Sequence, residues 1–378
     1  MSVVRREARR RWLTVGGAVL GLCALPVLIA AWPVPPPGID PATLRDRVLA
    51  SADQPYQGYA ESHGHLGIPD LSELGAVRGL LTGTTRIRSW YAGPDAWRVA
   101  TLSTTGEADE YRVPGSTYHW DFEYDFLVRI LDDVAVRLPR PSDLLPPELA
   151  RRLLRSAVAG DSVTSIAARR VAGRTAAGLR LHPSDPDTTV DRVDIWADPR
   201  TGLPLRVEIA AAAHGRPVFS TAFLEVALRP PAAGVLAVPR SGTADFATTT
   251  SRDLAELTEV FQDALPPPTL VGRARSTPAP NVSGVGWYGA GFGSFVAVSL
   301  PGRLGYEWAQ AARKAGGLDV GLPADVHGEV VEVRSELLTA IVVRTDDPRP
   351  LRRSYVLAGL VTPQLLRPAA IELLRGLP

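Results

Sequence analysis

The chain has 378 residues, of which 45% are hydrophobic and 21% are charged, so it is globular rather than disordered. Its length predicts two domains once any targeting segment is set aside. Lysine and arginine together number 41 against 40 acidic residues, and the basic residues are scattered along the chain. This balance excludes nucleic acid as a partner.

The N-terminal segment predicts export. Residues 1–11 hold five arginines and form a predicted cytoplasmic basic tail. The uncharged apolar run 12–32 is long enough to cross a bilayer as a helix, and the arginines before it predict that everything after it lies outside the cytoplasm. A cleaved signal peptide is the alternative. Cys23, the only cysteine, loosely matches a lipoprotein lipobox, and a single cysteine excludes an intrachain disulfide.

A proline-rich spacer, 33–40, follows and is predicted to be stiff and extended. Asp40 before Pro41 is typical of a helix start, and the apolar spacing after it predicts a short helix. A strand is expected over 56–63. The glycine- and leucine-rich stretch 64–83 is predicted to be a long loop.

The stretch 84–130 predicts a meander of antiparallel strands, because short runs rich in Trp, Tyr, Val, Ile and Thr alternate with turn residues. Alternation with period two predicts that Tyr118, Trp120 and Phe122 share one face of their strand. Such aromatic residues could form ordinary core, or they could line an apolar cavity for an acyl chain or an apolar peptide. The candidate ligand-binding residues are Trp90, Tyr91, Trp97, Tyr118, Trp120, Phe122 and Trp196.

The first exported domain is predicted to cover 41–229. After a helix beginning at Pro146 and ending by Gly160, it holds strands over 169–171, 178–182, 190–197, 205–212 and 218–228. A sheet of this size must curl or close.

Residues 230–251 are the predicted linker, and 252–378 the predicted small α+β domain. This domain is near the lower size limit for burying its own core, so it is expected to dock on the first. Its predicted elements are helices over 252–264, 306–315 and 362–374 and strands over 295–300, 329–333, 337–343 and 354–360.

No catalytic or metal-binding pattern is present in the sequence. There is no nucleophile elbow, P-loop or zinc-protease motif. His63 and His65 could reach one ion, but a metal site needs three or four ligands, so neither a metal nor a cofactor is expected. The glycines of 289–293 precede a strand instead of opening a helix, which predicts a flexible turn rather than a nucleotide loop. Without an acid, base or nucleophile constellation, the chain is not expected to be an enzyme.

Several segments resemble the MucB/RseB family, periplasmic regulators of the sigma-E envelope stress response. The strand, turn and strand of 193–209, followed by the strand 218–226, look like the family's hairpin, and 86–95 is similar to an earlier strand and turn. At the C-terminus, 295–300, 337–343 and 355–366 resemble its small domain. Lys314 is the only lysine, a bias typical of GC-rich coding sequence, so the resemblance is to an actinobacterial type.

This resemblance implies an α+β fold, in which a LolA/RseB-like unclosed antiparallel β-barrel covers helices, followed by the small domain. It also implies a non-enzymatic extracytoplasmic regulator. The chain departs from the family in its N-terminal segment, which predicts one transmembrane helix that anchors it at the cell membrane with its C-terminal domains extracytoplasmic. In the family, the regulator binds the extracytoplasmic part of an anti-sigma factor, and lipid-like molecules act as signals. The alternative is a lipid or lipoprotein carrier of LolA type.

Overall fold

The structure is a computed structural model, and it describes residues 11–19, 21, 34–35, 37–66, 75–104, 106–123, 125–131, 137–212, 215–239, 245–250, 265–276, 284–345 and 353–376. Residues 11–19 are helical, and most of the predicted membrane segment 12–32 lies outside the described residues, as do Cys23 and the predicted helix 252–264. Among the helices that the structure describes, none is both long and apolar enough to span a bilayer.

The larger part of the molecule is one sheet of twelve strands within the described residues. Its strands are β1 Tyr56–His65, β2 Thr82–Gly93, β3 Ala96–Leu102, β4 Glu107–Val113, β5 Ser116–Asp121, β6 Phe126–Leu131, β7 Ser162–Val171, β8 Arg174–His182, β9 Val190–Ala197, β10 Pro204–Ala211, β11 Pro217–Ala227 and β12 Asp245–Thr250. They pair in the order β12-β6-β5-β4-β3-β2-β1-β11-β10-β9-β8-β7. The sheet therefore has two edges, β12 and β7, and does not close into a barrel.

All neighbouring strands in this sheet are antiparallel except β12, which pairs in parallel with β6. The predicted meander of 84–130 is confirmed as β2 to β6, which follow one another both in the chain and in the sheet. The predominance of strands with a few helices confirms the mixed α+β class. β12 lies within the stretch 230–251 that the sequence predicts as a linker.

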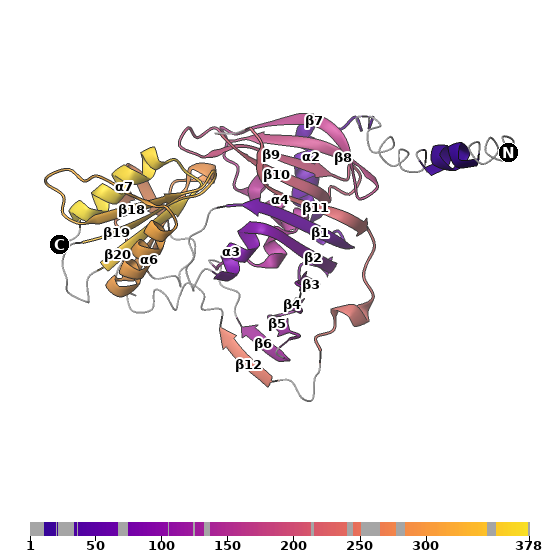
Figure 1. The fold of residues 1–378 in the computed structure, drawn as a ribbon, viewed down its shortest axis with the longest axis horizontal. Coiled ribbons are helices and arrows are strands. Elements are labelled where there is room, and N and C mark those ends of the chain that lie inside the picture. Colours follow the sequence, from indigo (N-terminus) through magenta and orange to yellow (C-terminus); the bar gives the residue numbers. More distant parts are fainter. Residues whose placement is uncertain are drawn as a thin grey trace, which may run out of the picture.

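Short helices pack against one face of the curved sheet (Figure 1). Helix α2, Pro41–Ala50, begins as predicted, because the Asp40 carboxylate accepts a hydrogen bond from the backbone N–H of Thr43 at 2.9 Å. Helix α4, Pro146–Arg155, buries Leu153 and Leu154 against the same face. The described residues of this unit also form the 3₁₀ turns η1 Ser51–Asp53, η3 Pro141–Leu144 and η4 Ala233–Leu236.

Two local predictions in this unit are wrong. Within the predicted loop 64–83, residues Gly75–Leu81 form helix α3, because Val77 is buried and its apolar neighbours pack on the core. Phe122 does not share a face with Tyr118 and Trp120. The strand ends at Asp121, whose carboxylate accepts a hydrogen bond from the N–H of Glu123 and turns the chain, which leaves Phe122 70% exposed.

The C-terminal part forms a smaller sheet of eight strands within the described residues, in the order β13-β14-β15-β16-β20-β19-β18-β17. Consecutive residues of β18 enter different apolar clusters: Val330 packs with helix α7 and Val331 packs with helix α6. The two helices therefore cover opposite faces. The elements are β13 Thr269–Leu270, β14 Arg273–Ser276, β15 Val285–Tyr288, β16 Phe295–Pro301, α6 Gly302–Lys314, β17 Leu318–Asp319, β18 Glu329–Arg334, β19 Thr339–Arg344, β20 Arg353–Gly359 and α7 Pro363–Gly376.

The small unit docks on the large one, as its size predicts. Phe292, in the 3₁₀ turn η6 Gly291–Gly293, and Leu337 are both buried in the core of the large unit. Thr188, between β8 and β9, forms a β-bridge with Val361. The glycine-rich segment 289–293 is thus a turn, as expected, and it delivers an apolar side chain to the contact between the units.

Candidate ligand-binding site

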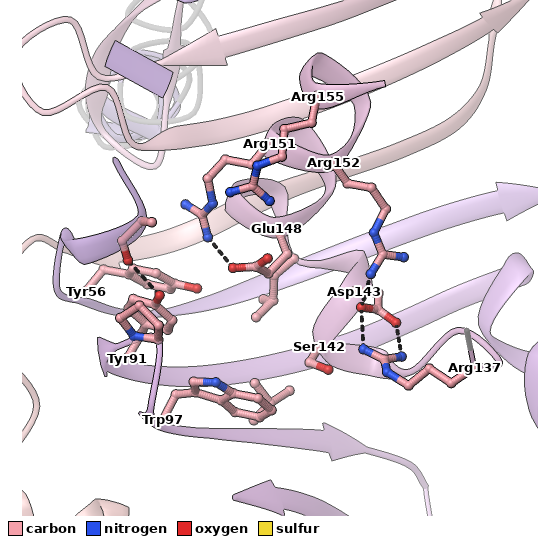
Figure 2. A pocket seen from close by; sticks show the side chains of 14 residues that line it. Tyr56, Tyr91, Trp97, Arg137, Ser142, Asp143, Glu148, Arg151, Arg152 and Arg155 are labelled. Atoms are coloured by element: carbon pink, nitrogen blue, oxygen red, sulfur yellow. Dashed lines mark hydrogen bonds and ion pairs between the residues drawn. The ribbon is translucent and has the colours of Figure 1, made fainter. Parts of the chain in front are cut away.

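A half-open cavity of about 270 Å³ lies between the first strands of the large sheet and helix α4. Figure 2 shows side chains from β1, β2 and β3 on one side and from η3 and α4 on the other, with η1 at one end. The sheet brings residues 52–56, 91–99 and 137–155 together at this point. The lining residues are Ala52, Tyr56, Tyr91, Pro94, Trp97, Val99, Arg137, Ser142, Asp143, Leu145, Glu148, Arg151, Arg152 and Arg155.

One wall of the cavity is aromatic. Tyr56 and Tyr91 are opposite each other on adjacent strands, and their rings stack with centroids 5.0 Å apart. Phe223 of β11 meets the ring of Tyr56 edge-on at 5.6 Å and holds it from the other side. Trp97 of β3, which pairs with Tyr91, continues this wall. The wall is therefore fixed by strand register and packing before any ligand arrives.

The opposite rim carries arginines. Arg137 and Arg152 both donate to the Asp143 carboxylate, at 2.6 Å and 2.7 Å. Burial opposes the ionised form of Asp143, but these two guanidinium groups outweigh it and hold the pKa of that carboxyl below its ordinary value. Arg151 is itself buried and pairs with Glu148, and it also reaches the hydroxyl of Ser51.

The Tyr56 hydroxyl and the Arg155 guanidinium line the cavity without a hydrogen-bond or ion-pair partner among the described residues. The hydroxyl of Tyr56 is buried and makes no hydrogen bond there. It points into the space between the aromatic wall and α4 (Figure 2). Arg155, on the exposed end of α4, forms no ion pair with any side chain that the structure describes. By contrast, the Tyr91 hydroxyl donates to the backbone carbonyl of Ala52 at 2.6 Å.

Both tyrosine hydroxyls stay protonated at neutral pH. Burial raises the pKa of Tyr91 to about 12, and it raises the pKa of the fully buried Tyr56 as well. The Tyr56 hydroxyl is therefore a hydrogen-bond donor that faces the cavity. Burying a hydroxyl without a partner costs free energy, so a hydrogen-bond acceptor placed in the cavity would be favoured.

Two of the seven residues that the sequence singled out line this cavity, namely Tyr91 and Trp97. The other five lie elsewhere. Trp90 is on the opposite face of β2, beneath the guanidinium of Arg98 at 4.7 Å. Trp196 is 2% exposed in the main core, with its indole N–H donating to the carbonyl of Ala167 at 3.0 Å.

The remaining three belong to the far end of the meander. Trp120 is buried in a small cluster with Tyr111 and Leu127, and Tyr118 packs against it together with Val238. Phe122 is exposed in the turn after β5.

Sequence reasoning missed the residues that give the cavity its polarity, above all Tyr56 and the arginines of α4. Arg151 and Arg155 are four residues apart, so they lie on neighbouring turns of one helix, and this spacing could have suggested a cationic site. Nothing local pointed to Tyr56, because its hydroxyl meets α4 only through folding.

The described residues contain no group of three or more His, Cys, Asp and Glu side chains able to hold a metal ion. Of the two histidines noted in the sequence, His63 makes a hydrogen bond of 2.9 Å with the hydroxyl of Thr84 on the exposed side of β1. His65 is also exposed. The chemistry that the cavity offers is hydrogen bonding, charge and apolar contact.

Comparison with known proteins gives matches among solved structures. No family model matches this sequence, and no curated protein matches it. The structure is similar to that of MucB in complex with MucA(peri), with 17% identity, a TM-score of 0.47, and coverage of 88% of this chain and 97% of that chain. The structure is also similar to the MucA/MucB complex of Pseudomonas aeruginosa, with 17% identity and a TM-score of 0.46. That match covers 87% of this chain and 96% of that chain.

A LolA superfamily protein from Nitrosomonas europaea matches with 9% identity and a TM-score of 0.24, and covers 53% of this chain and 99% of that chain. The structural neighbours of this chain thus include structures of MucB, which match it over most of its length. MucB belongs to the family that the sequence resembles.

Proposed function

We propose that this chain is an extracytoplasmic, non-enzymatic binding protein that contacts an anti-sigma factor and thereby modulates an envelope-stress sigma pathway. The observation that carries a binding role is the preformed cavity, in which an aromatic wall and a cationic rim surround a buried hydroxyl that has no partner in the described part of the chain. Such a site suits capture of a ligand rather than bond breaking, since its carboxylates Asp143 and Glu148 are both held in ion pairs with arginine.

The anti-sigma partner is supported by the residues that resemble the MucB/RseB family. They occur in both units, in the family's domain order, at 86–95, 193–209, 218–226, 295–300, 337–343 and 355–366. The ligand of the cavity would then act as the signal that changes how tightly the partner is held.

The location follows from the N-terminal charge pattern. Arginines precede an apolar run of membrane-spanning length, so we propose a single-pass anchor over 12–32 with both units outside the cytoplasm. Removal of the run as a signal peptide is the other form of the same export route.

Crosslinking in cells tests the partner. The full chain carries a photo-crosslinking residue at an exposed position of one unit at a time, for example in place of Arg303 or Phe122. Mass spectrometry of crosslinked membranes is expected to recover an anti-sigma factor, with more of it before envelope stress than after. Repeated recovery of no anti-sigma factor from either unit, under both conditions, contradicts the proposal.

A lipid or lipoprotein carrier of LolA type is the second candidate, and the aromatic wall of the cavity supports it. The two functions differ in what they hold in the cell. A carrier is expected to show bound acyl species when the chain, released gently from membranes, is analysed by native mass spectrometry. It is also expected to hand them to an acceptor membrane, which a regulator is not.

A further inference from the structure

The polar half of the cavity determines what kind of ligand fits it. Tyr56 is 1% exposed, its ring is held between Tyr91 and Phe223, and its hydroxyl has no partner among the described residues. The ring cannot turn the hydroxyl to solvent without breaking this packing. A ligand atom that accepts a hydrogen bond would satisfy the donor in place.

Charge narrows the class of acceptor. The lining holds four arginines, Arg137, Arg151, Arg152 and Arg155, but only two carboxylates, Asp143 and Glu148. Both carboxylates are already paired, so the excess of positive charge is left facing the space, with Arg155 lacking a partner among the described side chains. An anionic acceptor gains the hydrogen bond of Tyr56 and the attraction of the α4 arginines, which must outweigh repulsion from the Glu148 carboxylate near the same hydroxyl.

The size of the cavity and its apolar wall further restrict the class of ligand that can bind. At about 270 Å³ the cavity is slightly smaller than the usual small-molecule site, whose volume starts at about 300 Å³. Trp97, Val99 and Leu145 border the same space, so part of the ligand meets apolar surface. A bulky, uniformly charged ligand would leave this surface wet, and a purely apolar one would bury the Tyr56 hydroxyl and the arginines without partners.

We infer that the cavity binds a compact amphiphile with one anionic head, a carboxylate or a phosphate. The head lies between the Tyr56 hydroxyl and the arginines of α4, and the short apolar tail lies along Trp97. This assignment rests on the proposed ligand-binding role of the chain, but it does not require that the partner be an anti-sigma factor.

The test measures binding to the full chain in nanodiscs of zwitterionic phosphatidylcholine, and titrations into empty nanodiscs are subtracted. Calorimetric titrations at pH 7 use octanoate, octyl phosphate, the uncharged octyl glucoside and inorganic phosphate. At least one of the two anionic amphiphiles is expected to bind at least about tenfold more tightly than octyl glucoside and than inorganic phosphate. Equal binding of octyl glucoside would overturn the anionic head, and equal binding of inorganic phosphate would overturn the apolar tail.

Two substitutions locate the head. Tyr56→Phe removes only the hydroxyl, and Arg155→Gln removes only the charge. Each is expected to weaken binding of the anionic amphiphile about tenfold or more, since hydrogen bonds to charged groups are among the stronger ones. Tyr59→Phe, on the same strand, and Arg303→Gln, on the far unit, are the matched controls and are expected to bind like the unsubstituted chain.

The outcomes separate the two proposals. Unchanged affinity in Tyr56→Phe, with the fold verified by circular dichroism, refutes the assignment of the head. Capture of an anti-sigma factor without any amphiphile binding refutes this inference and leaves the partner intact. Binding of an anionic amphiphile without capture of an anti-sigma factor supports this inference and contradicts the proposed partner.

Discussion

At the scale of single residues, two stacked tyrosines differ in what their hydroxyls contact. Tyr91 donates to the carbonyl of Ala52 at 2.6 Å, and Tyr56 has no partner among the described residues. Phenylalanine at each position keeps the ring and removes the hydroxyl. The pair therefore separates a structural hydroxyl from one that is available to a ligand.

We expect Tyr91→Phe to lower the free energy of unfolding by about 1 kcal/mol, because it deletes a hydrogen bond and leaves a carbonyl without its donor. Tyr56→Phe is expected to leave it unchanged or to raise it by up to about 1 kcal/mol, because it deletes a buried group without a partner. Urea denaturation of the unliganded chain measures both. A loss for Tyr56→Phe as large as that for Tyr91→Phe would contradict this view of the cavity.

Asp143 gives the site a pH dependence. Although burial opposes it, Arg137 and Arg152 hold the pKa of this carboxyl below its ordinary value. A carboxyl with a depressed folded-state pKa stabilises the fold above its unfolded pKa of about 3.9, and this contribution is lost as the pH falls through the folded-state pKa.

Asp143→Asn is accordingly expected to cost about 3 kcal/mol of unfolding free energy at pH 7, because it removes a buried negative charge that Arg137 and Arg152 both contact. The cost should begin to shrink below about pH 4, where the unfolded chain takes up a proton at this carboxyl, and should be lost once the pH falls through the lower folded-state pKa. Urea unfolding at a series of pH values checks this. Asp46→Asn, in an exposed pair with Arg45, is the control and should change little at any pH.

At the scale of elements, the edge strand β7 is shaped by a glycine on its neighbour. β7 bulges between Ile166 and Arg169 where it passes Gly178 of β8. A Cβ atom at Gly178 would lie 2.6 Å from a side-chain carbon of Ile166 and 2.9 Å from the carbonyl oxygen of Ala167. The same carbonyl accepts the indole N–H of Trp196. The bulge of β7 therefore packs directly against the backbone of Gly178, where no side chain fits.

Gly178→Ala is expected to destabilise the large unit by about 2 kcal/mol, because the bulge must shift and the Trp196 hydrogen bond must stretch. Gly93→Ala is the control, since β2 leaves open space at that Cβ position. Thermal unfolding followed by tryptophan fluorescence would detect the difference. Equal melting temperatures for the two variants would show that β7 adapts without cost.

At the scale of the whole molecule, the two units are joined by an apolar contact at Phe292 and by a polar seam, which consists of the Thr189–Leu360 hydrogen bond and the ion pairs of Arg273. Phe292 enters the core of the large unit, and the backbone N–H of Thr189 donates to the carbonyl of Leu360 at 3.0 Å. Beside them, Arg273 pairs with Asp187 at 2.7 Å and with Asp185 at 3.2 Å. The contact couples the small unit to the strands β8 and β9 of the large sheet.

Phe292→Ala is expected to weaken this docking by about 3 kcal/mol, the usual cost of emptying an aromatic site in a core. Small-angle X-ray scattering should then show a larger radius of gyration and a broader distribution of distances. Leu318→Ala, at an exposed position of the small unit, should leave the scattering curve unchanged. An unchanged curve for Phe292→Ala would show that the polar seam alone holds the units together.

The sequence by itself determined the elements whose signals are local. Turn residues between β-rich runs predicted the strands from β2 to β6, and Asp40 and Pro41 predicted the start of α2. In the small unit, periodicity predicted β16, β18, β19, β20, α6 and α7 but not the short strands β13, β14, β15 and β17. It failed where tertiary packing overrode the local signal. The stretch Gly75–Leu81 is helical because its apolar residues meet the core, and Phe122 leaves its strand because Asp121 turns the chain.

Only the tertiary structure decided which aromatic residues face a cavity. Period two assigns residues to two faces of a strand but does not say which face a helix covers, so Trp90 and Trp97 looked alike. Folding placed α4 over the face of Trp97 and Tyr91 and brought Arg151 beside Ser51, a hundred residues away in the chain. A binding site depends on such distant contacts, and no local pattern in the chain carries them.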